Sequence, residues 1–99
     1  MPAIKQVPPI ILKEIFEAAD WRVYTEDNKN WSLVNSSGVS IELPKRGRFV
    51  SFQVAENAMA LAEMTPGDYF RCLCLVEDDR RERGLPVDGS EFHRHQRLQ

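Results

Sequence analysis

The sequence has few of the residues that build metal centres, disulfides and redox sites. Its 99 residues include two cysteines and two histidines, and Cys72 and Cys74 are separated by a single residue. A zinc site needs further Cys or His ligands at suitable spacing, and a disulfide between residues two apart would be strained. We therefore expect two reduced thiols that act as small apolar side chains, and neither a metal nor another cofactor.

The sequence also lacks a long apolar run and an excess of positive charge. No stretch approaches the roughly 18 consecutive apolar residues of a membrane-spanning helix, and residues 1–5 lack the apolar core of a signal peptide. Thirteen Lys and Arg against fifteen Asp and Glu give a formal net charge of −2. This balance excludes a uniformly basic nucleic-acid clamp but permits a local basic patch. The sequence predicts a small, soluble, cytoplasmic protein with no membrane partner.

The chain is expected to form one domain followed by a charged tail. Apolar residues recur at helical spacing over residues 9–19, which predicts a first helix. From residue 77 onward, acidic side chains and arginines dominate and the few apolar residues follow no period. Such a segment buries too little apolar surface to fold alone. We assign residues 1–8 to an extended segment, residues 9–76 to a single domain and residues 77–99 to a flexible tail.

Two strands joined by a turn follow the first helix. Residues 31–34 and 39–43 flank a polar turn, and the second segment alternates apolar and polar side chains as a half-buried strand does. Gly38 supplies the positive φ that this turn requires. Pro44 ends the second strand because it has no N–H group. Upstream, residues 21–24 are interpreted as a short strand or an extended exit from the helix.

The assignment of residues 25–55 includes a loop, a strand and the start of a helix. Residues 25–30 are polar throughout and predict a loop. Alternating apolar side chains favour a third strand over residues 49–54. Apolar residues further on recur at helical spacing, so a second helix must begin between Ser51 and Ala55.

A capping signal marks the start of the last predicted helix. Thr65 offers a capping hydroxyl, Pro66 suits the first helical position, and Asp68 follows three residues after the threonine. Residues 69–76 are also rich in strand formers, but the cap favours a helix. The sequence therefore predicts an α+β domain in which two or three helices pack against a small antiparallel sheet of about three strands, in the order α-β-β-β-α.

Several segments carry a resemblance to a known family, without a gap between them. Residues 12–23 (LKEIFEAADWRV) are similar to a first helix with an AGW exit, and Ser37-Gly38 stands where an Asp-Gly turn is common. Residues 41–47 (IELPKRG) resemble a V-T-V-P-R-H-G strand end, and residues 54–70 resemble a closing helix with an S-V-E-E-F extension. Over residues 10–73 the chain thus resembles the HicA-type (YcfA-like) toxin family. The resemblance implies a fold like that of double-stranded-RNA-binding domains, with RNA and a HicB-like antitoxin as candidate partners in a bacterial toxin–antitoxin pair.

The chain departs from that family at the catalytic position. The family's histidine, in a G-S-H-type motif at the start of the first hairpin strand, is replaced by Asn28, Lys29 and Asn30, with Trp31 next. A histidine there would be the general acid or base for attack of a ribose 2′-hydroxyl on the adjacent phosphate, which needs a group that titrates near pH 7. Neither Asn30 nor Trp31 can do so, and Arg46 replaces the family's second histidine. The comparison implies RNA or antitoxin binding without ribonuclease activity by the family mechanism.

Basic residues near the hairpin form the predicted binding site, and no catalytic or metal-binding residue is assigned. Lys45, Arg46 and Arg48 follow the second hairpin strand, a pattern that suits a phosphate backbone. Trp31 and Tyr24 would stack on bases if they were exposed. A core position for Trp31 and a solvated corner for the basic residues are the alternative interpretations. The predicted RNA-binding residues are Lys29, Asn30, Trp31, Lys45, Arg46 and Arg48.

Two further functions stay open and one is excluded. The chain could be a protein–protein interaction module with no nucleic-acid role, docking a HicB-like antitoxin, another protein or a second copy through a sheet edge. It could also be an active mRNA interferase toxin with a different catalytic group, although we expect the tail histidines, His93 and His95, to be solvated. A restriction-type nuclease is excluded because Glu42 and Lys45, separated by Pro44, cannot share the strand face that holds a metal.

Overall fold

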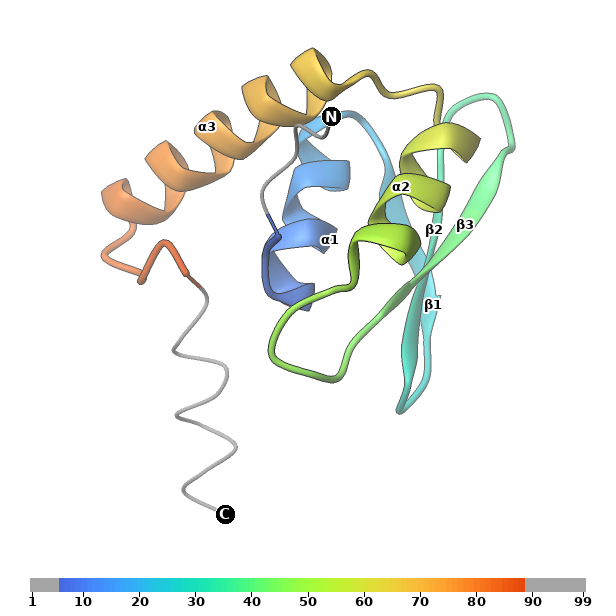
Figure 1. Cartoon of the computed structure of the whole chain (residues 1–99), viewed down its shortest axis with the longest axis horizontal. Coiled ribbons are helices and arrows are strands. Elements are labelled where there is room, and N and C mark those ends of the chain that lie inside the picture. The colour runs from blue at the N-terminus through green and yellow to red at the C-terminus, as the bar shows by residue number, and fades with distance from the viewer. Residues whose placement is uncertain (1–5, 89–99) are drawn as a thin grey trace.

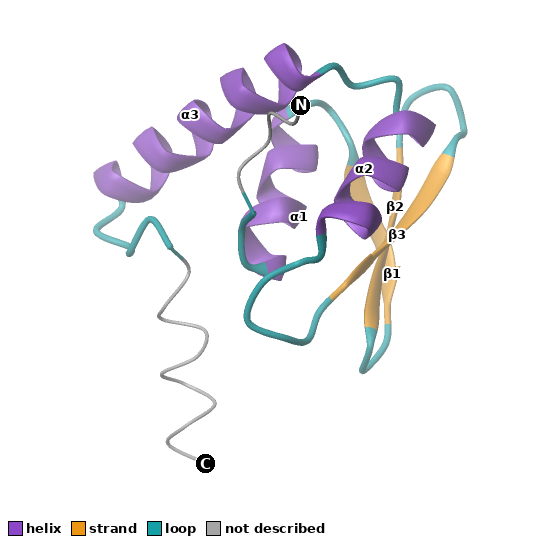
Figure 2. Ribbon diagram, in the orientation of Figure 1, coloured by secondary structure: helices purple, strands orange, loops and turns teal. Residues whose placement is uncertain are grey.

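Two helices cover one face of a three-stranded antiparallel sheet in the computed structural model, which describes residues 6–88 (Figure 1). A third helix packs on the first, on the side away from the sheet (Figure 2). The predicted α+β class is confirmed, and the order α-β-β-β-α is extended by one helix. The elements are α1 (Pro9–Ala18), β1 (Arg22–Glu26), β2 (Asn30–Val34), β3 (Ser40–Pro44), α2 (Phe52–Leu61) and α3 (Pro66–Glu82).

The first helix has the limits that its sequence predicts. Pro8 is the N-cap residue and a proline follows at the first helical position, where an N–H group would have no partner within the helix. Asp20 ends the helix with a φ of 74°, and the Trp21 N–H then donates to the Phe16 carbonyl at 3.1 Å. The buried face holds Pro9, Ile11, Leu12, Ile15 and Phe16. This face packs against both the sheet and α3.

The predicted hairpin is confirmed as β2 and β3. β2 is the central strand of the sheet, and β3 pairs with it along its whole length. Gly38 in the connecting turn has a φ of 86°, and Pro44 is the last residue of β3. The inward-facing side chains of the two strands are buried in the core: Trp31, Leu33, Ile41 and Leu43. The remaining side chains of these strands are half-buried or exposed.

The third strand is β1, and the predicted strand over residues 49–54 is wrong. β1 pairs antiparallel with β2, with a register shift of one residue at Tyr24 that forms a bulge. The predicted loop over residues 25–30 is therefore limited to residues 27–29. A strand at the edge of a sheet keeps one side and one face in water, so the polar composition of β1 does not prevent pairing.

Residues 49–51 form the entry into α2 rather than a strand. Val50 is buried, and its N–H donates to the Val7 carbonyl at 2.9 Å. Ser51 is the N-cap, since its hydroxyl accepts a hydrogen bond from the Val54 N–H at 3.2 Å. The helix then starts at Phe52, within the predicted interval. The alternation of apolar side chains that predicted a strand over residues 49–54 thus comes from one buried valine followed by the cap of a helix.

The last helix starts where predicted and continues further than predicted. Thr65 and Asp68 form a reciprocal capping box, and residues 69–76 are helical as expected. The helix extends to Glu82, so residues 77–82 are not part of a flexible tail. Arg80 lies in this extension and is only 1% exposed, paired with Glu14 of α1. The rest of the predicted tail from residue 89, with His93 and His95, and residues 1–5 lie outside the described residues.

Two further features concern the thiols and the helices. Cys72 and Cys74 are free thiols, and burial raises the pKa of Cys72. None of the helices in the described part of the chain is long and apolar enough to cross a membrane. Among residues 6–88, no group of three or more His, Cys, Asp and Glu residues is arranged to hold a metal ion.

Candidate nucleic-acid interface

Two segments that are distant in sequence meet at one end of the sheet. They are the β1–β2 turn over residues 27–29 and the loop after β3, and Figure 1 shows both at the lower end of the strands. The Lys45 N–H donates to the Lys29 carbonyl at 2.9 Å. The Arg46 Nε donates to the Asn28 carbonyl at 3.0 Å. We call the side chains of Lys29, Lys45, Arg46 and Arg48 the basic end.

Asp27 fixes the shape of the β1–β2 turn. Its Oδ1 accepts hydrogen bonds from the N–H groups of Lys29 and Asn30, each at 2.8 Å. These two backbone hydrogen bonds lower the pKa of the Asp27 carboxyl, and the charges of Lys45 and Lys29 lower it further. The carboxylate is therefore ionised at neutral pH. It holds the turn in the form that directs the Asn28 carbonyl toward Arg46.

Lys45 is held in place more firmly than the other cations of the basic end. Its Nζ donates to Glu26 Oε2 at 2.9 Å and to the Asp27 carbonyl at 3.0 Å. The same Nζ lies 5.7 Å from the centroid of the Trp31 ring, and Lys13 Nζ of α1 lies 5.5 Å from it. Lys45 thus neutralises Glu26 and covers the indole, which leaves it less free to meet a ligand.

Trp31 and Asn30 support the site rather than line it. Trp31 is 5% exposed and belongs to the hydrophobic core, so the exposure that base stacking requires is absent. The prediction that Trp31 contacts a ligand is wrong for that reason. Asn30 is half-buried, and its backbone closes the turn through hydrogen bonds to Asp27 in both directions. Tyr24, the other residue considered for stacking, is exposed at the bulge of β1.

The exposed cations of the basic end are Lys29, Arg46 and Arg48. Arg46 uses its Nε–H for Asn28, and its terminal N–H groups make no hydrogen bond with the described part of the chain. Arg48 forms no ion pair within residues 6–88. Gly47 lies between the two arginines with a φ of 100°, a backbone conformation that L side chains rarely adopt. The glycine therefore sets the path of the loop that presents both guanidinium groups.

Sequence reasoning missed four residues of this region. Glu26 and Asp27 were placed in a loop without a role, although they neutralise and position Lys45. Phe49 and Phe52 were placed in a strand, but they are 56% and 46% exposed beside the basic loop. The signal in the sequence was the short spacing between the aromatic residues and the preceding basic run, residues 45–48.

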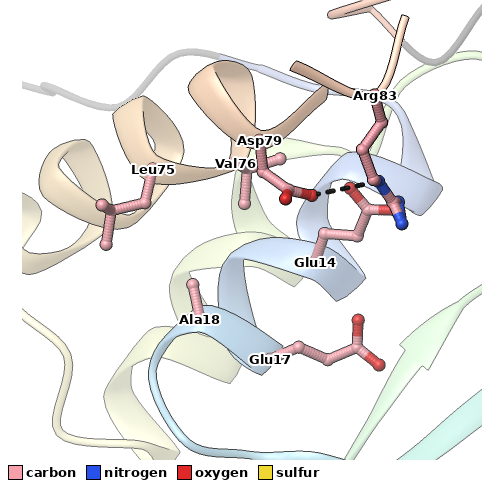
Figure 3. A pocket seen from close by; sticks show the side chains of 7 residues that line it. All are labelled: Glu14, Glu17, Ala18, Leu75, Val76, Asp79 and Arg83. Atoms are coloured by element: carbon pink, nitrogen blue, oxygen red, sulfur yellow. Dashed lines mark ion pairs between the residues drawn. The ribbon is translucent and has the colours of Figure 1, made fainter. Parts of the chain in front are cut away.

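A pocket between α1 and α3 also lies near charged side chains (Figure 3). It has a volume of about 400 Å³ and is lined by Glu14, Glu17, Ala18, Leu75, Val76, Asp79 and Arg83. Each of its acidic residues is paired inside the protein. Glu14 pairs with Arg80, Glu17 with Lys13, and Asp79 with Arg83. Because these charges are already compensated, the pocket is a weaker candidate than the basic end.

No protein-family model, no curated protein and no solved structure matches this chain significantly. The candidate site therefore depends on the geometry and the electrostatics of the chain's own residues.

Proposed function

We propose that the chain is an RNA-binding domain that holds the phosphate backbone at the basic end and does not cleave it by the mechanism of HicA-type toxins. One observation carries the proposal. Hydrogen bonds from Lys45 and Arg46 to the backbone of the β1–β2 turn join two segments into one cationic surface. A phosphate backbone is the ligand that clustered Lys and Arg side chains recognise without further chemistry.

The charge balance at the basic end favours an anionic ligand. Four cations stand against Glu26 and Asp27, and Lys45 already neutralises Glu26. The terminal N–H groups of Arg46 retain the forked geometry that binds two phosphate oxygens at once. Lys29 and Arg48 add point charges on either side. The surface therefore offers about three phosphate contacts, enough for binding that weakens steeply with salt.

The residues at the basic end do not supply a proton-transfer group for cleavage. Attack of a 2′-hydroxyl needs an acid or base that titrates near neutral pH, and residues 6–88 contain no histidine. The carboxyl of Asp27 is committed to two backbone hydrogen bonds, and its pKa is lowered further from neutrality. Lys and Arg remain protonated and favour binding of the substrate rather than removal of its proton. The resemblance to HicA-type toxins is part of this proposal, with binding retained and the family's catalytic step lost.

Fluorescence anisotropy with a labelled RNA hairpin at two salt concentrations tests the proposal. Three phosphate contacts predict a slope of log affinity against log salt of about −2 to −3. Arg46→Glu and Arg48→Glu are each expected to weaken binding at least about tenfold, because each removes one contact and adds a repulsive charge. Arg22→Glu, at the opposite end of β1, is the matched control and is expected to change affinity less than about threefold.

The same samples, run on a denaturing gel, test the absence of cleavage. Intact RNA is expected throughout. Cleaved RNA that persists in Arg46→Glu would point to a different catalytic group and would contradict the proposal. Salt-independent binding, or an equal loss of affinity in Arg22→Glu, would also contradict it.

A protein-binding role is the second candidate, and exposed apolar side chains favour it. Leu61 at the end of α2 and Phe70 and Leu75 on α3 are all more than half exposed. Exposed apolar groups can mark a docking surface for a partner protein, such as a HicB-like antitoxin or a second copy. Light scattering at rising concentration, compared between the native chain and Leu61→Asp, detects self-association. A concentration-dependent mass that Leu61→Asp abolishes would favour this role.

A further inference from the structure

Two phenylalanines adjoin the basic end and are not used by the core. Phe49 directly follows Arg48, and Phe52 follows three residues later. They are 56% and 46% exposed, respectively. Their neighbour Val50 is buried, so this segment had an apolar position available and filled it with the smaller residue. Large aromatic rings left in water beside arginines indicate a surface that meets a ligand.

The backbone around Phe49 is anchored on both sides of Val50. The Val50 N–H donates to the Val7 carbonyl at 2.9 Å, and the Val50 carbonyl accepts from Gln6 Nε2 at 3.0 Å. These two hydrogen bonds hold Val50 in the core, while the adjacent Phe49 remains 56% exposed. The exposed ring therefore lies next to an anchored residue.

Phe52 is fixed by the start of α2. The Ser51 hydroxyl caps the helix through the Val54 N–H at 3.2 Å, which makes Phe52 the first helical residue. The buried face of α2 is formed by Ala55, Ala58 and Met59. Phe52 lies outside that face, at the end of the helix that adjoins the basic loop. The two exposed rings thus flank the hydrogen-bonded segment Val50–Ser51, within four residues of Arg48.

From this arrangement we infer that Phe49 and Phe52 are base-stacking residues and that the preferred RNA has unpaired nucleotides beside the phosphates held by the basic end. The inference rests on the proposed function and specifies its ligand. Unpaired bases expose a flat aromatic face, which stacks on a phenylalanine ring whatever the base. A continuous duplex hides those faces in its own stack and offers only backbone and groove edges. The combination of arginines and exposed rings therefore selects single strands, loops or bulges over a blunt duplex.

Anisotropy titrations of the full chain with two labelled probes test the inference. One probe is an unstructured strand of uridines, and the other is a blunt RNA duplex with the same number of phosphates. Phe49→Ala and Phe52→Ala are each expected to lower affinity for the single strand about tenfold and to leave the duplex affinity and the salt slope unchanged. Phe49→Tyr is expected to retain most of the single-strand affinity, because the ring is kept.

A matched control and a second substitution separate stacking from general apolar contact. Phe70→Ala removes a phenylalanine that is 65% exposed on α3, and it is expected to leave both affinities unchanged. Phe49→Leu keeps an apolar side chain without an aromatic face, and we expect it to bind like Phe49→Ala. All three phenylalanines are exposed, so thermal unfolding of these variants should match that of the native chain.

The outcomes distinguish this inference from the proposed function. Equal affinity for both probes, native-like binding by Phe49→Leu, or an equal loss in Phe70→Ala would overturn the stacking role, even where Arg46→Glu still abolishes binding. Absence of salt-dependent binding to either probe would overturn the proposed function and the inference together. The stacking role and the proposed function are both supported if Phe49→Ala and Phe52→Ala lose affinity for the single strand only and Phe70→Ala loses none.

Discussion

Glu14 of α1 and Arg80 of α3 form an ion pair with two parallel hydrogen bonds. Arg80 Nε donates to Glu14 Oε1 at 2.8 Å, and Nη2 donates to Oε2 at 3.0 Å. Arg80 Nη1 also donates to the Pro86 carbonyl at 2.9 Å. Because Arg80 is buried, this pair joins the last turns of α3 to α1 and holds the chain that follows the helix against it.

Removing the charge of Glu14 is expected to destabilise the fold. Glu14→Gln leaves the buried guanidinium of Arg80 facing a neutral amide, and the expected loss in the free energy of unfolding is about 2–3 kcal/mol. Urea denaturation followed by circular dichroism measures it. Glu17→Gln is the control on the same helix, since Glu17 pairs with Lys13 at the surface, and its effect should stay below about 0.5–1 kcal/mol. Equal effects of the two substitutions would contradict a special role for the buried pair.

The capping box of α3 predicts a position-specific loss. Thr65→Ala removes the hydroxyl that accepts from the Asp68 N–H at 3.1 Å, so the free energy of unfolding should fall by about 1 kcal/mol. Thr65→Ser keeps the hydroxyl and should remain close to the native value. The same urea titration measures both variants. A loss in Thr65→Ser as large as in Thr65→Ala would show that the methyl group, and not the cap, is what matters.

Burial of Tyr69 predicts that the protein loses stability at high pH. Burial raises the pKa of Tyr69 from 10.0 to about 12, because the ionised phenolate is poorly solvated there. The neutral form therefore stabilises the fold fully below pH 10, and this contribution is lost as the pH rises through about 12. A spectrophotometric titration of Tyr24→Phe, which leaves Tyr69 as the remaining tyrosine, measures the shift. Ionisation near pH 10 in the folded protein would contradict it.

The carboxyl of Asp27 predicts that the β1–β2 turn loses support at low pH. Hydrogen bonds from the Lys29 and Asn30 N–H groups lower its pKa from the ordinary value of 3.8. The ionised form therefore supports the turn fully above that value, and the support is lost as the pH falls through the lower pKa of the folded state. A carbon-detected NMR titration of the carboxyl gives this pKa directly. Titration at or above the ordinary value would show that the two backbone hydrogen bonds do not persist in solution.

Gly47 predicts a conformational requirement in the basic loop. Its φ of 100° is strained for any L side chain, so Gly47→Ala should lower the free energy of unfolding by about 1–2 kcal/mol and weaken RNA binding. Gly67, in the first turn of α3, has an ordinary φ, and an added Cβ would meet Thr65 Oγ1 at 3.8 Å. Gly67→Ala should therefore stabilise the protein by up to about 1 kcal/mol. A change in the free energy of unfolding with the same sign in both variants would contradict the requirement for glycine at position 47.

Local signals predicted the elements that local interactions fix. The cap at Thr65, the turn at Gly38 and the amphipathic pattern of α1 each depend on neighbours within a few residues. β1 was ambiguous because its strand state comes from pairing with β2, which its polar composition does not encode. The C-terminal turns of α3 were missed because Arg80 finds its partner 66 residues away. Charged composition alone cannot tell a buried ion pair from a solvated tail.

The candidate site was predictable as a set of charges but not as an arrangement. The position of Lys29 before β2 and of Lys45 after β3 follows from the hairpin, since antiparallel neighbours bring those ends together. The partners of Lys45 and the burial of Trp31 depend on three elements at once. Phe52 was hidden by the strand assignment, because Val50, Phe52 and Val54 alternate as the apolar face of a strand does. Exposure of a side chain is a tertiary property, and a period-two pattern does not determine it.

The bulge at Tyr24 and the proline at the end of β3 have a consequence for how these molecules behave at high concentration. β1 and β3 are the two edges of the sheet, and within residues 6–88 neither pairs with a further strand. An edge with a long, flat row of free amides recruits strands from other molecules and starts cross-β aggregation. The bulge distorts one edge, and Pro44, which lacks an N–H group, shortens the other. Both edges of this sheet thus disfavour growth by strand addition, which protects the folded chain from fibril formation.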